Sequence, residues 1–380
     1  MSKKKVLLIV NPTSGKNKSR PNAVDIVNKF SPDDYEFDIR ATTCQGDATN
    51  IIKKHIGDND MVICCGGDGT FNETVNGVMQ LTKRIPIGYL PAGSTNDLAN
   101  TIGLPLDIDK STAMIADGHI NAYDIGLFNN RYFTYIASFG AATNFSYETP
   151  KKIKNAFGHN GYLLYALGMH PIATLKTVKP THVKIEYDGN VIEDDFYFGS
   201  ISNSTSVAGI FKFSESDVKL DDGRFELLLV RKLSSPLESF ALLGQIKRKH
   251  YDGKKVLFLK CSSVKMTFEE ETPWTLDGEY GGTPKEVRFS VLNGAVDIFS
   301  PENAMFTGKP YEAVLQEMPE EEKKENSEKT SRIRKFRKGN KAEEADEITE
   351  DEAQAEETAD ETIAAQAESP ASAEAENEDK

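Results

Sequence analysis

Residues 62–73, Val-Ile-Cys-Cys-Gly-Gly-Asp-Gly-Thr-Phe-Asn-Glu, constrain the fold most, because an apolar run leads into a glycine-rich turn and then a helical pattern. Gly66, Gly67 and Gly69 carry no side chain, so their backbone N–H groups can come close to a polyphosphate. The start of a helix adds partial positive charge. Asp68 would repel phosphate unless Mg²⁺ bridges the two or the carboxylate orients a network around the metal. The stretch therefore predicts the phosphate site of a kinase, and it also fits a tight strand-to-helix turn without a ligand.

Strand and helix patterns alternate around this stretch. Residues 5–10 form a continuous apolar run, which is typical of a strand buried on both faces of a parallel sheet. A helix at 21–30, a strand at 35–41 and a helix opened by residues 46–48 follow, and another strand, 86–90, comes after the glycine-rich turn. This alternation predicts an α/β fold with a parallel sheet and helices on both faces.

Small and polar residues follow four of the predicted strands, in residues 11–16, 42–47, 66–72 and 93–97. Ligands of open parallel sheets bind beyond the carboxyl ends of the strands, so we expect these turns to converge on one site. The first turn lacks the Walker spacing and also fits an ordinary turn, and Asn96-Asp97 also fits a helix cap.

Short alternating segments separated by turn residues begin near Asp124. Residues 191–192, 196–202 and 287–291 are among these segments, which predict a second, mainly β region with a sandwich-like arrangement. Residues 151–176 interrupt the pattern with basic side chains and a predicted helix.

These patterns predict two domains and a tail. We expect an α/β domain that contains the predicted phosphate site at residues 1–126, completed by residues 296–315, and a β-rich domain at residues 127–295. Residues 317–380 contain too little apolar surface to fold, which predicts a disordered acidic tail.

The net charge of −14 comes almost wholly from the end of the chain. Residues 342–380 hold sixteen acidic residues and one Lys, a net charge of −15, which leaves +1 for residues 1–341. Residues 331–341 hold six basic side chains and predict peripheral contact with an anionic membrane, with the acidic stretch as an electrostatic brake. A solvated tail that serves only solubility fits the same composition.

The sequence predicts a cytoplasmic protein that is soluble or peripheral at the inner face of the membrane. Its longest apolar runs are too short to span a bilayer, and residues 1–5 lead into a strand without a signal-peptide pattern. Cys44, Cys64, Cys65 and Cys261 lack paired spacing, so we expect reduced thiols. The six His residues are scattered, which argues against a zinc site.

The motifs of this sequence, taken in their order along the chain, resemble those of the diacylglycerol kinase catalytic-domain family, in particular its soluble members from Gram-positive bacteria. The similarity covers roughly residues 5–305. The motifs that carry it are Asn11-Pro-Thr-Ser-Gly-Lys16, Gly46-Asp-Ala48, Gly66-Gly-Asp-Gly-Thr70 with Asn72-Glu73, Asn96-Asp97, Leu220-Asp-Asp-Gly223 and Asp277-Gly-Glu-Tyr280. The resemblance implies a lipid kinase that uses ATP and Mg²⁺ to convert diacylglycerol to phosphatidic acid, with a nucleotide domain facing a lipid domain across a cleft.

The resemblance also implies which residues contact the nucleotide. They are Asn11, Pro12, Thr13, Ser14, Gly15, Thr42, Gly66, Gly67, Asp68, Gly69, Thr70, Phe71, Asn72 and Ser94. Asp68 would act near the catalytic metal. One departure from the family is that Gly93-Ser94-Thr95 stands where the family usually has Gly-Thr before its Asn-Asp pair, and Ser94 keeps the hydroxyl.

Two further roles follow from the resemblance. Asp222 would bind a second, structural Mg²⁺ together with main-chain oxygens of Lys219 and Arg224. Glu279 would be the general base, because a primary alcohol must lose a proton as it attacks. Without the resemblance, residues 277–279 also fit a hairpin turn with exposed acids.

Three alternatives stay open. A kinase of the same fold could act on another lipid alcohol, such as a sphingoid base, phosphatidylglycerol or an isoprenoid. NAD kinase is less favoured, because it would not explain residues 11–16 together with residues 277–279. A non-enzymatic lipid-binding regulator would need a broken site, whereas Asp68, Asp222 and Glu279 are all present. The sequence indicates no nucleic-acid partner and is compatible with an oligomer.

Overall fold

The computed structural model describes residues 2–15, 22–140, 179–207, 211–302 and 305–308. The helix predicted within residues 151–176, the basic run 331–341 and the tail 317–380 lie outside these residues.

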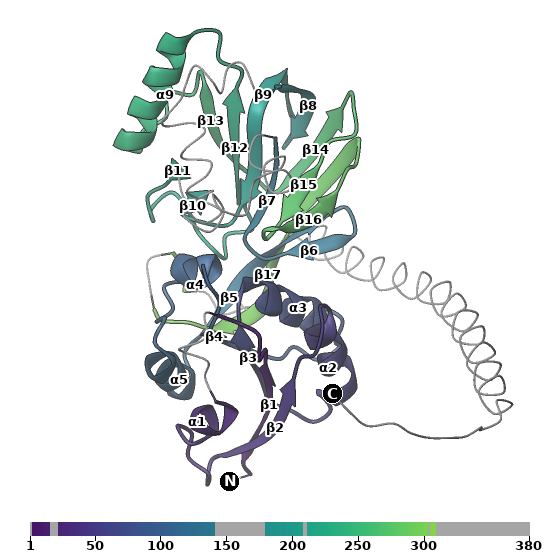
Figure 1. Ribbon diagram of the computed structural model, residues 1–380, viewed down its shortest axis with the longest axis vertical. Coiled ribbons are helices and arrows are strands. Elements are labelled where there is room, and N and C mark those ends of the chain that lie inside the picture. Colours follow the sequence, from purple (N-terminus) through teal and green to yellow (C-terminus); the bar gives the residue numbers. More distant parts are fainter. Residues whose placement is uncertain (1, 16–21, 141–178, 208–210, 303–304, 309–380) are drawn as a thin grey trace, which may run out of the picture. The chain divides into compact units, whose positions relative to one another are not determined.

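A parallel sheet forms the N-terminal part of the chain (Figure 1). Its strands are β1 (Lys4–Val10), β2 (Tyr35–Ala41), β3 (Met61–Gly66) and β4 (Ile87–Pro91). β1 pairs in parallel with β2 and with β3, and β3 pairs in parallel with β4. All residues of β3 and β4 are buried, as expected for strands covered on both faces. The predicted parallel α/β arrangement is confirmed.

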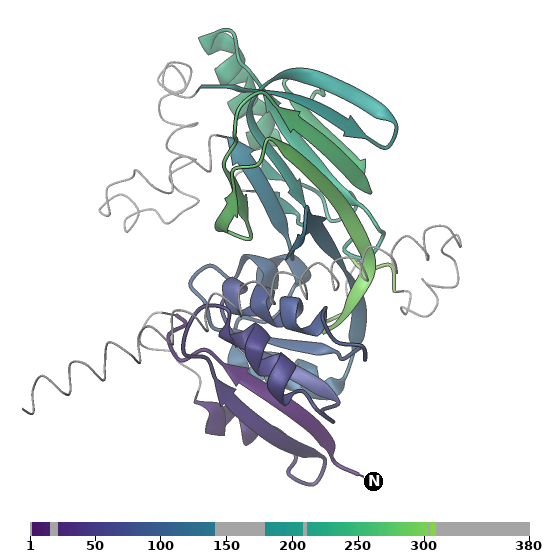
Figure 2. The same ribbon diagram turned by 90° about the vertical axis from the view of Figure 1, so that its right-hand side faces the viewer.

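Helices cover both faces of this sheet (Figures 1 and 2). They are α1 (Ala23–Val27), α2 (Asp47–His55), α3 (Asp68–Val78), α4 (Asp97–Ile102) and α5 (Ile108–Asp117). On one face, Ile26 of α1 and Ile115 of α5 belong to a core cluster with strand residues such as Leu8 and Ile63. α2 and α3 lie on the other face (Figure 1). They pack so closely that a Cβ at Gly77 would lie 2.8 Å from the side chain of Ile52.

The rest of the described chain is mainly antiparallel strand. Its elements are β5 (Ile120–Phe128), β6 (Arg131–Phe133), β7 (Ile136–Gly140), β8 (Thr181–Tyr187), β9 (Asn190–Ser202), β10 (Ser206–Val207), β11 (Phe211–Lys212), β12 (Phe225–Arg231), α9 (Pro236–Arg248), β13 (Val256–Cys261), β14 (Ser263–Phe268), β15 (Trp274–Leu276), β16 (Glu279–Gly282) and β17 (Glu286–Phe299). An aromatic core fills this region, where the ring centroid of buried Trp274 lies 4.9 Å from those of Phe128 and Phe139.

Strand β17 joins the two regions into one sheet. It pairs in antiparallel fashion with β14 and β5, and near its end Ile298 pairs in parallel with Ile87 of β4. β17 crosses residue 295, so the sheet is continuous at the boundary expected from the sequence, and the division into two domains stays a prediction.

None of the helices in the described part of the chain is long and apolar enough to cross a membrane. All four cysteines are free, and only Cys44 is exposed.

Candidate active site

Three of the predicted turns lie against one another beyond the carboxyl ends of β1, β3 and β4. The amide Nδ2 of Asn11 donates to Oγ1 of Thr70 over 2.9 Å. A Cβ at Gly93 would lie 2.7 Å from Cα of Gly67, and one at Gly66 would lie 2.6 Å from Cβ of Thr70. A side chain at Gly93 would force two of the turns apart, and a side chain at Gly66 would displace Thr70. The first amide groups of α3, which have no acceptor within the helix, are therefore presented beside bare backbone.

The fourth turn, residues 42–47, is tied to α3 by the carboxylate of Glu73. That carboxylate accepts hydrogen bonds from the backbone N of Gly46 (2.7 Å) and Ala48 (3.2 Å), at the N-terminus of α2. Burial raises the pKa of Glu73, and these two amide donors oppose that shift. Thr42, the predicted nucleotide contact in this turn, is buried and donates its backbone N–H to the carbonyl of Val10. Glu73 thus links the two motifs that contain Gly46 and Glu73 in the folded chain.

Asp68 joins the turn 66–72 to α4. Its carboxylate accepts hydrogen bonds from the backbone N of Asp97 (3.0 Å) and Leu98 (3.3 Å). Burial raises its pKa, whereas these helix N-terminal amides favour the charged form. Asn96, at the N-cap of α4, adopts a left-handed conformation (φ 50°), and its Oδ1 accepts a hydrogen bond from the backbone N of Gly93. Asn96 and Asp97, the two residues that also fitted a helix cap, therefore both take part in the hydrogen bonds that hold these turns together.

Glu279 lies beside the N-terminus of α3. Its Oε1 would be 3.3 Å from a Cβ at Gly69, and its Oε2 accepts a hydrogen bond from Nε2 of Gln45 over 3.1 Å. Gln45 belongs to the turn 42–47, so the structure brings the predicted base next to two of the predicted nucleotide turns. Ser94 is exposed.

Asp277 holds the turn that carries Glu279, and sequence reasoning assigned it no role. Its carboxylate accepts five hydrogen bonds, from Nδ2 of Asn72 (2.7 Å), Oγ1 of Thr134 (2.7 Å) and the backbone N of Thr134 (2.6 Å), Tyr135 (3.0 Å) and Ile136 (3.0 Å). The residue is buried and has a φ of 49°, and burial raises its pKa against these donors. The Asn72 bond connects the turn directly to α3.

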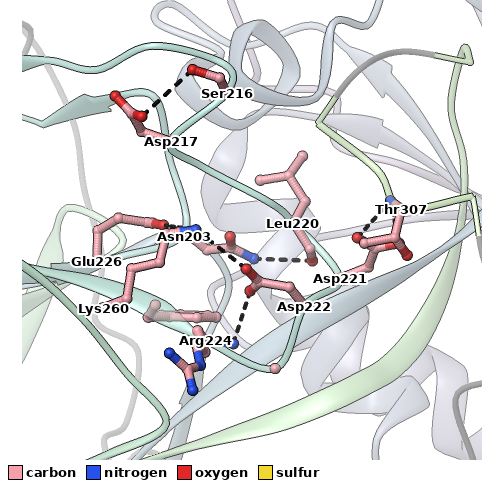
Figure 3. A network of polar contacts seen from close by, with 12 residues as sticks. Asn203, Ser216, Asp217, Leu220, Asp221, Asp222, Arg224, Glu226, Lys260 and Thr307 are labelled. Atoms are coloured by element: carbon pink, nitrogen blue, oxygen red, sulfur yellow. Dashed lines mark hydrogen bonds and ion pairs between the residues drawn. The ribbon is translucent and has the colours of Figure 1, made fainter. Parts of the chain in front are cut away.

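A second polar cluster surrounds the loop 219–224, where Asp222 lies. Asp124 is fully buried, and its carboxylate accepts hydrogen bonds from the backbone N of Gly223 (2.7 Å) and Gly294 (2.5 Å). Burial raises its pKa well above the usual value. Asp221 accepts hydrogen bonds from the backbone N and Oγ1 of Thr307 (Figure 3). Asp124, which sequence reasoning also missed as a site residue, fixes this loop to β17.

Asp222 lies between a backbone amide and an ammonium group (Figure 3). Its Oδ1 accepts a hydrogen bond from the backbone N of Arg224 (3.0 Å), and its Oδ2 lies 3.3 Å from Nζ of Lys260. The same Nζ is 4.0 Å from Oε1 of Glu226, which is too far for a hydrogen bond. Lys260 therefore supplies positive charge between two carboxylates.

The chemistry of this loop fits a hard cation in part. Within the described ranges, no group of three or more His, Cys, Asp or Glu side chains could hold a metal ion. However, both carboxylate oxygens of Glu226 and Oδ1 of Asn203 are buried without a hydrogen-bond partner, and Nδ2 of Asn203 donates to the carbonyl of Leu220. Buried acceptors without donors suit Mg²⁺ held by main-chain oxygens, water and a single carboxylate. Lys260 competes for that carboxylate.

Comparison with known proteins gives one consistent family. Residues 5–128 match the model of the diacylglycerol kinase catalytic domain. The diacylglycerol kinase of Bacillus subtilis (strain 168) is 35% identical over 285 residues, covering 73% of this chain and 91% of the relative. That of Staphylococcus carnosus (strain TM300) is 35% identical over 311 residues, covering 80% and 98%.

Among solved structures, the crystal structure of a diacylglycerol kinase from Bacillus anthracis matches with a TM-score of 0.59 and 26% identity, covering 78% of this chain and 97% of that one. The resemblance seen in the motifs is thus confirmed by the fold and by the relatives. The chain is a kinase and belongs to the diacylglycerol kinase family.

Proposed function

We propose that this chain is an ATP- and Mg²⁺-dependent lipid kinase that phosphorylates the primary hydroxyl of diacylglycerol to give phosphatidic acid at the inner face of the membrane. The names of its relatives support the acceptor. The observation that carries the proposal is the position of Glu279, whose carboxylate lies beside Gly69 at the N-terminus of α3. A proton acceptor thus lies next to a predicted phosphate site.

The proposed ATP site consists of residues 11–15, Thr42, residues 66–72 and Ser94. Bare glycine backbone and the N-terminus of α3 favour the β- and γ-phosphates, because amide groups there point outward without acceptors. The hydrogen bond from Asn11 to Thr70 keeps the first turn against the glycine-rich turn. Preformed turns lower the ordering cost of binding.

The transfer step needs a base and correct positioning. The acceptor hydroxyl gives its proton to the carboxylate of Glu279 while its oxygen attacks the γ-phosphorus. The bond from that phosphorus to the β–γ bridging oxygen breaks, and ADP leaves with the electron pair. Asp277 and Asn72 hold the turn of Glu279 against α3, so the carboxylate stays beside the phosphate site.

The divalent cations have two proposed positions. When bound, Mg²⁺ neutralises charge on the β- and γ-phosphates and holds an acidic loop in place. Asp68 would act near the catalytic ion, and the first amides of α4 donate to both of its carboxylate oxygens. Asp222 and the main-chain oxygens of Lys219 and Arg224 would hold the structural ion.

A phosphoryl-transfer assay tests the proposal. The purified chain is incubated with γ-labelled ATP, Mg²⁺ and, separately, diacylglycerol, a sphingoid base, phosphatidylglycerol, an isoprenoid alcohol and NAD. We expect label in phosphatidic acid, and at least about 10²-fold slower labelling when the Glu279→Gln variant replaces the wild type. Preferred transfer to another lipid alcohol would overturn the acceptor, and transfer to NAD or to nothing would overturn the lipid kinase itself.

A further inference from the structure

Helix α9 presents an apolar outer face at its first half. Leu237 is 78% exposed and Phe240 is 58% exposed, and Leu237 is the most exposed large apolar side chain in the described ranges. Leu242 is 2% exposed and lies on the opposite side of the helix. Figure 1 shows α9 on the outside of the β-rich region. The helix is therefore held by one side and carries its exposed apolar residues on the other.

The helix starts at a well-formed cap, so its outer face is a fixed structural feature. Oγ of Ser235 accepts a hydrogen bond from the backbone N of Glu238, and Pro236 stands in the first turn. The carboxylate of Glu238 lies 3.0 Å from Nζ of Lys255, which neutralises the acidic residue nearest to the apolar face.

Basic side chains continue the same face at the other end of the helix. Lys247 and Arg248 are exposed, and the helical repeat of 100° per residue places them near the direction of Leu237 and Phe240. None of the ion pairs between described residues includes either of them. Residues 236–255 hold five basic and two acidic residues, a net charge of +3, compared with +1 for the whole of residues 1–341.

The basic and aromatic character extends beyond the end of α9. A pocket of about 220 Å³ lies there, and its lining includes Lys249, His250, Tyr251 and the acidic Asp217. Phe213 and Phe258 also line this pocket, and their rings stack with their centroids 4.2 Å apart. The C-terminal end of α9 thus lies next to a pocket lined by aromatic and basic residues and one acidic residue.

We propose that α9 and the segment that follows it, residues 236–255, dock on the surface of an anionic membrane. Leu237 and Phe240 enter the boundary between headgroups and acyl chains, while Lys247 and Arg248 contact lipid phosphates. This inference deepens the proposed function, since it rests on a lipid acceptor that lies in the membrane. A second copy of the chain is disfavoured as the occupant, because pairing would bring two segments of net charge +3 together, each with Lys247 and Arg248 on the paired face.

Vesicle binding tests the docking surface with the full chain. We compare wild type with Leu237→Ser/Phe240→Ser and with Lys247→Gln/Arg248→Gln, using phosphatidylglycerol vesicles and phosphatidylcholine vesicles. Loss of the two charges should weaken binding to phosphatidylglycerol at low salt by about 25-fold, roughly fivefold per charge, with a smaller effect at 0.5 M salt. Loss of the two apolar side chains should weaken it on the order of tenfold.

Matched controls separate this surface from general effects. Val191→Ser removes another exposed apolar side chain, which is 60% exposed, and Lys54→Gln/Lys110→Gln removes two exposed charges elsewhere. The controls should bind vesicles as the wild type does. Equal binding by all variants would overturn the proposal. So would sedimentation equilibrium that shows a wild-type dimer and a Leu237→Ser/Phe240→Ser monomer with unchanged vesicle binding, because α9 would then be a subunit interface.

An activity assay distinguishes failure of this inference from failure of the proposed function. With short-chain diacylglycerol dispersed below its aggregation limit, the α9 variants should match the wild type in kcat/KM, because the chemistry is untouched. With diacylglycerol in phosphatidylglycerol vesicles, their kcat/KM should fall in parallel with binding. If the wild type phosphorylates neither form, the proposed function fails, and the binding data alone still decide whether α9 docks.

Discussion

Replacing Asp277 by Asn should destabilise the fold strongly, because this carboxylate is the acceptor for donors from two distant segments, α3 and residues 134–136. Three of its five hydrogen bonds end on Oδ2, from Asn72 and from two atoms of Thr134, and two end on Oδ1, from the backbone N of Tyr135 and Ile136. An amide can accept on one side only. The best orientation therefore keeps three bonds and leaves two buried N–H groups facing an NH₂ group.

The expected size follows from those two lost bonds. Hydrogen bonds to a charged group are worth about 1.5–3 kcal/mol each, so their loss amounts to roughly 3–6 kcal/mol. The neutral amide offsets part of this lost free energy, because burying it carries no cost of burying a charge. That cost is what raises the pKa of Asp277. We expect a net loss of about 3 kcal/mol. Backbone strain adds nothing, because Asn tolerates the left-handed φ of 49° as well as Asp does.

Thermal unfolding followed by circular dichroism measures this effect. A loss of about 3 kcal/mol corresponds to a fall in Tm of roughly 6–12 °C for a fold of this size. Asp188→Asn is a matched control, because Asp188 also precedes a glycine in a turn with a left-handed φ of 42°, but the residue and its hydrogen bonds from Ser262 and Ser263 are exposed. The control should shift Tm by less than about 2 °C. An Asp277→Asn variant that melts with the control would refute the role assigned to this carboxylate.

Further predictions concern the acidic loop and the cysteines. Asp222→Ala should lower Tm and abolish any rise in Tm given by millimolar Mg²⁺. Lys260→Met should enlarge that rise, because no ammonium group then competes for Asp222. Tm values that do not change with Mg²⁺ in either variant or in the wild type would contradict the proposed metal site. Burial raises the pKa of Cys64 and Cys65 to about 12, so at pH 8 a thiol reagent should modify one cysteine of the native protein, Cys44, and all four after unfolding. Because unfolded thiols ionise near pH 8.5 and these two do not until about pH 12, the free energy of unfolding should fall as pH rises through that window in urea titrations, and a constant value would contradict the assignment.

The parallel sheet and its turns were predictable because their signals are local. Apolar runs such as residues 5–10 mark strands buried on both faces, and the glycines at 66, 67 and 69 mark the point where β3 turns into α3. These features depend on residues close together in the sequence, so a single sequence contains them.

Strand lengths in the β-rich region were predicted less well. Residues 191–192 and 196–202 were interpreted as separate segments, but both belong to β9. The acidic residues between them stay in the strand because Asp194 and Asp195 pair with Arg231 and Lys232 on the neighbouring chain segment. Residues 287–291 likewise belong to the longer β17, which continues past an irregularity where Asp124 accepts the amide of Gly294.

The supporting carboxylates of the candidate site could not be found from sequence. Asp277 accepts hydrogen bonds from residues 141 to 205 positions away, and Asp124 binds the amide of Gly294, which is 170 positions away. No local pattern encodes such contacts, because they depend on how distant strands pair. Glu73 is an intermediate case, since its motif was noticed but its role at the N-terminus of α2 was not.

Turnover of the Glu279→Gln variant tests directly whether Glu279 is the base of the transfer step. The substitution keeps the shape of the side chain and removes the proton acceptor beside Gly69. We expect the turnover for phosphorylation of diacylglycerol by ATP to fall by about 10²- to 10⁴-fold, which is the usual contribution of a positioned base to the rate. Tm and the Kd for ATP should stay as in the wild type. Turnover within about threefold of the wild type would contradict the role of Glu279 as the general base. Glu279 would then be an ordinary turn residue, and the base would lie elsewhere.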